Sequence, residues 1–303
     1  MTPFKHKVFM FFWKINLIKK PTLDLLKKTR LINNPKIVSD LYLNSKFKAT
    51  LDNISFYLYN EKYDKSSFDI YLDGIEKSWD RTSLKIWKDL SVRSDVIFDV
   101  GTNIGLYCLT AKKGNTAAKV IGFEPSNNSF NKAKKNVQIN DCEIILEKVA
   151  LSNVKGKATF YDSSKHTAVS SLVMSSNLRN DNLISYEVDV STFDDYVQLN
   201  NIEKVDLVSI DVEENEQNVL LGMTEVIARD KPTILIEVLR AELGEKIQAI
   251  LDQHNYSYYF VNETGYVKPT NTLNDRPYDF VHSFNVLAIF REDINDFLIS
   301  KWV

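Results

Sequence analysis

The sequence predicts an α/β fold in which helices cover both faces of a mostly parallel β-sheet. Short apolar runs of strand length alternate with helical segments from about residue 95 onward, a pattern typical of parallel sheets that are buried on both faces. Several of these runs end in an acidic residue. The 303 residues include 44% hydrophobic and 26% charged residues, which is ordinary for a globular chain with a sizeable core.

The expected elements succeed one another with short connections. Residues 1–50 have helical patterning, residues 54–59 alternate like a strand or a hairpin edge, and residues 78–90 show helical spacing. Strands are expected at 96–100, 120–123, 143–150, 205–210, 233–238, 256–261 and 284–290, and helices at 104–113, 128–138, 214–228 and 242–254. We therefore expect a helical and hairpin extension over residues 1–80 and a main domain over residues 81–295.

Charge and cysteine content narrow the classes of function. The net charge of -2 gives no global field toward nucleic acid, so no nucleic-acid partner is expected. Cys108 and Cys142 form no paired motif and are expected to be buried, reduced thiols, which favours a cytoplasmic location. The lysine-flanked apolar run Val8–Trp13 is too short for a signal peptide. It predicts an amphipathic helix that docks on its own domain or in a homodimer, with peripheral membrane contact as an alternative.

Acidic residues stand at the ends of four expected strands. They are Asp99, Glu124, Asp211 with Glu213 beside it, and Glu237. In open parallel sheets, ligands bind beyond the carboxyl ends of the strands. The sequence therefore predicts that these carboxylates surround a ligand site.

The turn after the first of these strands has the residues of a tight strand-to-helix connection. Gly101 permits positive φ and a close approach to the backbone, Asn103 tolerates the left-handed conformation, and Gly105 would let the next helix pack close to the sheet. Glu124 follows Gly101 by 23 residues. At that spacing an acid can accept hydrogen bonds from both hydroxyls of an unphosphorylated ribose, which both NAD and S-adenosylmethionine contain.

Five segments carry a resemblance to a known family. They are Val96–Tyr107 (VIFDVGTNIGLY), Gly122–Ser126 (GFEPS), Val149–Ser152 (VALS), Ser209–Gly222 and Ile234–Val238 (ILIEV). In order and spacing, over residues 95–240, they resemble the motifs of the FkbM family, whose members methylate oxygen. The resemblance implies a Rossmann-like class I methyltransferase fold with a mostly parallel seven-stranded sheet. It also implies S-adenosylmethionine as the cofactor and a hydroxyl acceptor on a sugar, a glycan or a secondary metabolite.

The resemblance also implies roles for individual residues. Asp99, Gly101 and Asn103 would lie near the methionine part of the cofactor, Glu124 on its ribose and the segment of Ala150 and Ser152 near its adenine, with Gly105 in the same site. Two positions depart from the family pattern. Ser209 stands where the family usually has lysine, and Glu214 stands where it usually has glycine. Both departures lie at the end of the fourth expected strand, on the substrate side.

Asp211 is the leading candidate for a catalytic base. It ends an apolar strand and should point into the cleft, where a carboxylate could accept the proton of a substrate hydroxyl. Together with Glu237 it could instead hold a divalent cation, but a direct role is favoured. No His/Cys spacing suggests zinc. His166, in a polar loop, is a further candidate base, whereas Glu214 and Glu216 are expected to be solvated acids in the first turn of a helix.

Three alternatives stay open at this stage. An NAD-dependent oxidoreductase would need a third glycine and a helix start that binds diphosphate, and the segment after Gly101 supplies neither well. A cofactor-binding scaffold without catalysis is motivated by Ser209 and Glu214. Transfer to nitrogen would suit the acids, but the sequence lacks the NPPY-type signature of some amino-group methyltransferases.

Overall fold

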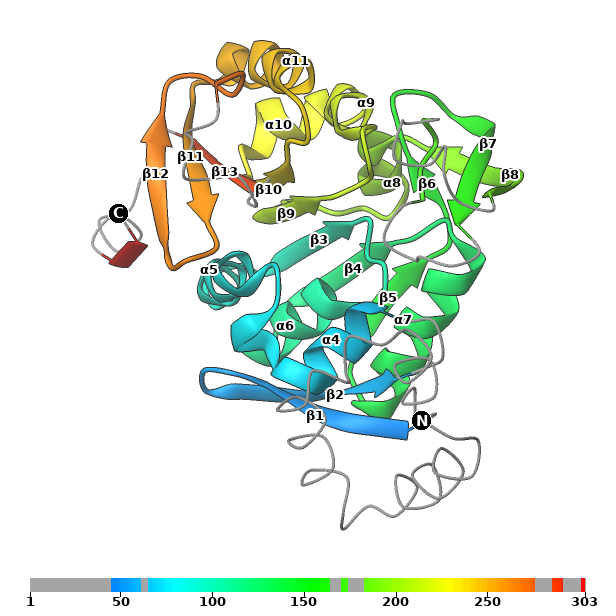
Figure 1. Cartoon of the computed structure of the whole chain (residues 1–303). Helices are drawn as coiled ribbons and strands as arrows, with labels where there is room; N and C mark the ends of the chain where they lie inside the picture. Colours follow the sequence, from blue (N-terminus) through cyan, green and yellow to red (C-terminus); the bar gives the residue numbers. More distant parts are fainter. Residues whose placement is uncertain are drawn as a thin grey trace, which may run out of the picture.

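The computed structural model describes residues 45–60, 65–163, 170–173, 183–275, 285–290 and 301–302. Its centre is an eight-stranded sheet (Figure 1). The strand order is β12 (Tyr266–Thr270), β11 (Tyr256–Asn262), β13 (Asn285–Phe290), β10 (Thr233–Glu237), β9 (Leu207–Ile210), β3 (Val96–Val100), β4 (Lys119–Phe123) and β5 (Ile144–Glu147). The five strands from β10 to β5 are parallel, and β13, β11 and β12 are antiparallel to their neighbours.

The predicted α/β fold is confirmed, with one strand more than expected. Seven strands form the expected mostly parallel sheet, and β12 adds an eighth at its edge. The β12 segment is polar and contains Pro269, a residue that cannot donate to a ladder and is therefore confined to edge strands. This segment is short and contains no apolar run, so its sequence does not predict a strand.

Helices cover both faces of the sheet (Figure 1). One face carries α8 (Phe193–Leu199), α9 (Glu216–Leu221), α10 (Thr224–Asp230) and α11 (Ala241–Leu251), and the other carries α5 (Arg81–Ser91), α6 (Leu106–Gly114) and α7 (Asn127–Ile139). Successive residues of β3 point to opposite faces, so Phe98 packs in the first core and Ile97 in the second. Both faces of the central strands are therefore buried, which explains their continuous apolar sequences.

An N-terminal hairpin packs against the helices of the second face. Strands β1 (Ser45–Leu51) and β2 (Ile54–Asn60) pair in antiparallel fashion, and α4 (Lys65–Asp73) follows. Tyr57 N and Tyr59 N donate hydrogen bonds of 2.7 Å to the side chains of Asn140 and Asn136. The hairpin prediction is confirmed, but helix up to residue 50 is wrong, because Ser45–Leu51 alternates polar and apolar residues and forms β1.

Residues 1–44, with the apolar run 8–13 and its predicted helix, lie outside the described residues. Within the described ranges, no helix has both the length and the apolarity that crossing a membrane requires. Cys108 and Cys142 are both free thiols. Cys108 is buried as expected, but Cys142 is only partly buried.

A second, three-stranded sheet lies beside the end of β5. It consists of β6 (Ala150–Leu151), β8 (Leu183–Ser191) and β7 (Gly156–Ser163), in that order. The strand expected over 143–150 is therefore split, because the chain leaves the main sheet after Glu147 and pairs with β8 from Ala150. Strands β7 and β8 flank the polar loop, and His166 within that loop lies outside the described residues.

The helix expected over 214–228 is interrupted. It forms α9 and α10, which are separated at Gly222 and Met223. A Cβ atom at Gly222 would lie 2.1 Å from the carbonyl oxygen of Ser152, so this close contact demands glycine. Contact with a distant loop, rather than local helix propensity, sets the end of α9.

Candidate active site

A cavity of about 170 Å³ opens at the carboxyl ends of the central strands. Its wall is formed by residues that follow β3, β4, β9 and β10, by the start of β6 and by residues 170–172. The strand order reverses between β3 and β9, so the cavity lies where open α/β sheets bind their ligands.

The structure places the predicted site residues in three groups. Gly101, Asn103, Glu124, Ala150, Asp211 and Glu237 line the cavity. Asp99 lines a smaller cavity of about 20 Å³ beside it, together with Ser209, Asp211, Tyr107 and Asn285. Gly105 and Ser152 line neither, and His166 lies outside the described residues. Most of the carboxylates predicted at strand ends therefore lie together around the cavities, as the position of ligand sites in parallel sheets predicts.

The turn after β3 has the left-handed backbone that its sequence predicts. Asn103 has a φ of 49° and Gly105 a φ of 85°. Gly101 has a φ of 91°, and a Cβ atom there would lie only 1.7 Å from the carbonyl oxygen of Asp211. Gly101 is thus required by contact with the backbone of Asp211, and its lack of a side chain lets the ends of β3 and β9 pack closely together.

The close packing expected at Gly105 is found at another glycine. A Cβ atom at Gly105 would make only an ordinary contact of 3.5 Å with Ala133, whereas at Gly122 in β4 it would lie 2.4 Å from Thr102 Oγ1. Gly105 is therefore required by its backbone conformation at the start of α6.

Glu124 is a buried carboxylate held by two backbone donors. It is 6% exposed, and its oxygens accept hydrogen bonds of 2.8 Å from Asn103 N and Ser126 N. Burial raises the pKa of Glu124 to about 7, although these two bonds oppose the shift. Each carboxylate oxygen has a second acceptor position, so the fixed group can still accept hydrogen bonds from a ligand in the cavity.

Asp99 is held on the other side of β3. Ser209 Oγ donates a hydrogen bond of 2.6 Å to Asp99 Oδ1, and the side chain of Asp99 is 3% exposed. Burial raises its pKa. Its second oxygen has no hydrogen-bond partner among the described residues, so this carboxylate is suited to a donor or a cation from a ligand.

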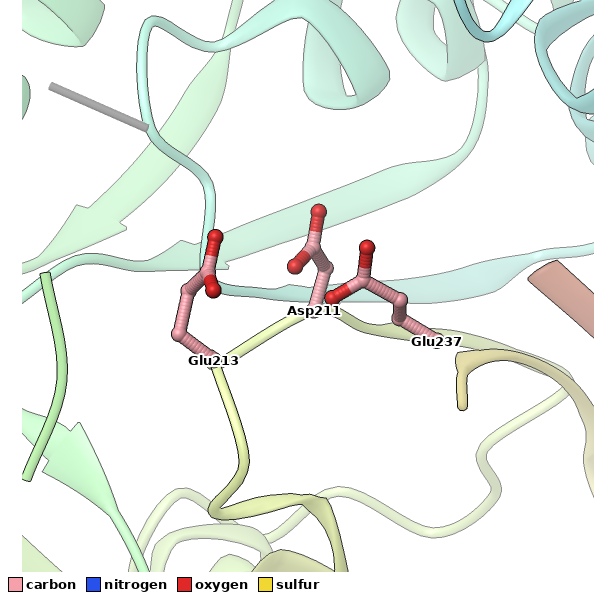
Figure 2. Close-up of side chains that lie close together, drawn as sticks. All are labelled: Asp211, Glu213 and Glu237. Carbon is pink, nitrogen blue, oxygen red and sulfur yellow. The ribbon is translucent and has the colours of Figure 1, made fainter. Parts of the chain in front are cut away.

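Three carboxylates that line the cavity lie close together (Figure 2). Asp211, Glu213 and Glu237 each offer one oxygen, and these three oxygens lie within 4.8 Å of one another. Asp211 is exposed, whereas Glu213 and Glu237 are partly buried. Desolvation is the main cause that raises the pKa values of all three groups. For Glu213 and Glu237, the charges of neighbouring acids raise the pKa further.

The position of Glu216 in the first turn of a helix predicts a solvated side chain, but the structure buries it. Its side chain is fully buried, and its Oε1 accepts hydrogen bonds from Val212 N and Glu214 N. The carboxylate holds the loop after β9, so the dipole argument was wrong for it. The same prediction was wrong for Glu214, whose side chain is 5% exposed and forms an ion pair with Arg240.

Residues before position 81 complete the wall of the cavity, and sequence reasoning missed them. Ser66 and Trp79 line it, and Trp79 is 45% exposed. The neighbouring Asp80 accepts hydrogen bonds of 3.2 Å from Tyr107 Oη and 3.1 Å from Asn285 Nδ2. Burial raises the pKa of Asp80 to about 8. No local motif marks these residues, because they reach the cavity only through tertiary packing.

Comparisons with known proteins agree with this geometry. The family model for the methyltransferase FkbM domain matches residues 99–258, more than half of the chain. The hexuronic acid methyltransferase AglP of Haloferax volcanii is 26% identical over 164 residues, covering 52% of this chain and 64% of that protein. Methyltransferase 1 of Beauveria bassiana is 26% identical over 145 residues, covering 43% of this chain and 58% of that protein. Both matches thus cover less than two thirds of the relative.

Among solved structures, a methyltransferase FkbM from Methylobacillus flagellatus KT is 13% identical, with a TM-score of 0.44 over 74% of this chain and 53% of that one. The match to the family model, which begins at Asp99 and extends to Tyr258 in β11, covers every strand end that lines the main cavity. The chain therefore belongs to the FkbM family of methyltransferases.

Proposed function

We propose that this protein transfers the methyl group of S-adenosylmethionine to a hydroxyl group of a sugar. The observation that carries the proposal is Glu124, a buried carboxylate that lines the cavity and is fixed by two backbone donors. A carboxylate held in this way recognises a pair of ribose hydroxyls with little loss of side-chain entropy. Asp99, whose second oxygen lacks a partner, is suited to the ammonium group of the same molecule.

Asp211 is the proposed acceptor of the hydroxyl proton. It lines both cavities, between the donor residues and Glu237. As the acceptor oxygen forms a bond to the methyl carbon, the bond from carbon to sulfur breaks and its electron pair stays on sulfur, giving S-adenosylhomocysteine. The hydroxyl proton passes to the Asp211 carboxylate. The protein mainly aligns donor and acceptor and excludes water.

The lining of the cavity favours a neutral sugar. The charged residues that line it in the described part of the chain are all acidic: Glu124, Asp211, Glu213 and Glu237. Repulsion from these groups would oppose a negatively charged sugar, although one relative is named for hexuronic acid. The exposed indole of Trp79 offers a flat apolar surface at the cavity for the apolar face of a sugar ring.

The first experiment is a calorimetric titration of the full chain with S-adenosylmethionine and, separately, with NAD. We expect micromolar binding of S-adenosylmethionine, no binding of NAD and loss of affinity in Glu124→Ala. A matched control is Glu187→Ala, which removes an exposed acid paired with Lys157. Binding of NAD alone would contradict the proposal.

The second experiment tests the acceptor. Transfer of labelled methyl from S-adenosylmethionine is measured with neutral glycosides and with the corresponding uronides. We expect methyl ethers on the neutral glycosides. Methylation of uronides alone would show that the charge argument is wrong, and labelling of amines would overturn transfer to oxygen.

A further inference from the structure

The three neighbouring carboxylates that line the cavity have the geometry of a cation site. We infer that Asp211, Glu213 and Glu237 bind one hard divalent cation, such as Mg²⁺, Mn²⁺ or Ca²⁺. Their three oxygens lie within 4.8 Å of one another. Oxygen ligands lie about 2.0–2.6 Å from such cations, so two of them are separated by at most about 5 Å. The spacing in the protein therefore fits one shared ion.

The three ligands come from segments that the fold holds in place (Figure 2). Asp211 directly follows β9, and its N–H donates a hydrogen bond of 2.9 Å to Val100 O in β3. Glu237 ends the neighbouring strand β10. Glu213 lies in the loop that Glu216 fixes through Val212 N and Glu214 N. Little reorganisation is needed to place three oxygens around an ion.

Buried carboxylate oxygens without partners supply the second, independent observation. Glu237 Oε2 is shut off from solvent and has no hydrogen-bond partner among the described residues. The same is true of Glu216 Oε2, which belongs to a side chain with 0% exposure beneath the cluster. A buried acceptor without a donor is costly. A cation among Asp211, Glu213 and Glu237 would satisfy the first oxygen and offset the charge of the second.

No positive side chain in the described ranges compensates the cluster. The residues that line the two cavities include no lysine, arginine or histidine within those ranges. The nearby Arg240 forms an ion pair with Glu214, on the other side of the loop. Ser209, at the end of β9, contributes only a hydroxyl, which is bonded to Asp99. The negative charge of the cluster thus calls for a cation from solution.

A cation here would act on the acceptor. It would hold the acceptor oxygen and lower the pKa of its hydroxyl, while the second oxygen of Asp211 stays free to receive the proton. This catalytic role rests on the proposed methyl transfer, but the affinity for a cation does not. Metal binding and binding of S-adenosylmethionine can therefore be tested separately.

The test uses Mn²⁺ as the probe. The full chain is treated with EDTA, returned to chelator-free buffer and titrated with Mn²⁺, and the free ion is followed by electron paramagnetic resonance. We expect one bound Mn²⁺ per chain, displaced by excess Mg²⁺ or Ca²⁺. Glu213→Gln and Glu237→Gln should each weaken binding by about tenfold or more. Glu187→Gln is the matched control, since its exposed carboxylate pairs with Lys157 and lines neither cavity, and it should bind Mn²⁺ as the wild type does.

Thermal melting provides the second readout. Mn²⁺ should raise the melting temperature of the wild type and of Glu187→Gln but not that of the two cluster variants. If Glu237→Gln does not fold, Glu237→Asp, which withdraws the carboxylate by one methylene, should weaken binding in the same way. An undiminished signal of free Mn²⁺ with the wild type, or equal affinity in the cluster and control variants, would overturn the inference.

Calorimetry with S-adenosylmethionine in EDTA separates the two proposals. If S-adenosylmethionine binds but Mn²⁺ does not, the cation site is wrong and the proposed function stands. If Mn²⁺ binds but S-adenosylmethionine does not, the reverse holds.

Discussion

The carboxylates on the two sides of the cavity differ in their hydrogen-bond partners. On the side of β3 and β4, both oxygens of Glu124 accept bonds from backbone N–H groups. On the side of β9 and β10, Asp211, Glu213 and Glu237 face one another, and Glu237 Oε2 lacks a partner. The Glu124 carboxylate is fixed by bonds within the chain, whereas the carboxylates of the second side face one another without a positive partner among the described residues. On the proposed function, the first side would recognise the methyl donor and the second would act on the acceptor.

The largest effect should come from Asp211→Asn, which removes the proton acceptor from the second side. We expect kcat to fall by about 10²–10⁴-fold, the usual contribution of a general base. The affinity for S-adenosylmethionine should change little, because the ribose contact lies at Glu124. Steady-state kinetics and calorimetry measure the two quantities, and an equal loss in both would mean that the two sides are not separable.

Gly101→Ala should disrupt the close packing between the end of β3 and the end of β9. The added Cβ would lie 1.7 Å from Asp211 O, at a φ of 91°, so we expect a loss of about 3 kcal/mol or more in the free energy of unfolding. Gly265→Ala is the matched control, since its φ is 126° but no atom lies within 4 Å of the new Cβ. It should cost about 1 kcal/mol. Urea unfolding compares them, and similar losses would refute the steric argument.

The first side should respond to pH through Glu124. Its pKa is raised from 4.5 to about 7, so its ionised form, which accepts bonds from ribose, accumulates as pH rises from 6 to 8. The affinity for S-adenosylmethionine should then rise about tenfold. The same raised pKa contributes stability to the ligand-free protein below pH 4.5, and this is lost as pH rises through about 7. Titrations at pH 6, 7 and 8 measure the affinity.

Glu124→Gln is the control for this pH effect, because an amide keeps the shape but does not titrate. Its affinity for S-adenosylmethionine should be low and flat over the same range. A wild-type affinity that does not change with pH, or a slope that survives in Glu124→Gln, would assign the titration to another group.

The smallest effect is expected at Trp79, on the acceptor side of the comparison. Trp79→Ala should raise KM for a sugar acceptor by about fivefold, since an aromatic contact contributes about 1 kcal/mol. Trp79→Phe should retain most of the affinity, and donor affinity should be unchanged in both. A change in donor affinity would place the indole on the wrong side of the cavity.

The sequence predicts well the central sheet and the carboxylates that line the cavity, because both follow from local patterns. Apolar runs reveal β3, β4, β9 and β10, and the carboxyl ends of such strands must meet at one edge. Glu124, Asp211 and Glu237 were found for this reason. Within α9, the burial of Glu216 could not be read from its position in the first turn, because it depends on the path of the loop before it.

The missed features depend on contacts between distant segments. The break between α9 and α10 at Gly222 lies against the carbonyl group of Ser152. No local sequence pattern predicts this contact. Trp79 lies just before α5, which is anchored to the turn after β11, where the carboxylate of Glu263 accepts hydrogen bonds of 2.6 Å from Thr82 N and 3.3 Å from Ser83 N. Such pairings become visible only when the chain is folded.

The wall formed by Ser66 and Trp79 has an evolutionary consequence. These residues precede the family-matched region, which begins at residue 99, while the donor contacts proposed for Glu124 and Asp99 lie inside it. On the proposed function, we therefore expect mutations in the N-terminal segment to alter the choice of acceptor without disturbing the binding of the methyl donor. Relatives with diverged N-terminal segments would then form a natural series of substrate preferences, and exchanging residues 65–80 between them would transfer acceptor choice from one enzyme to another.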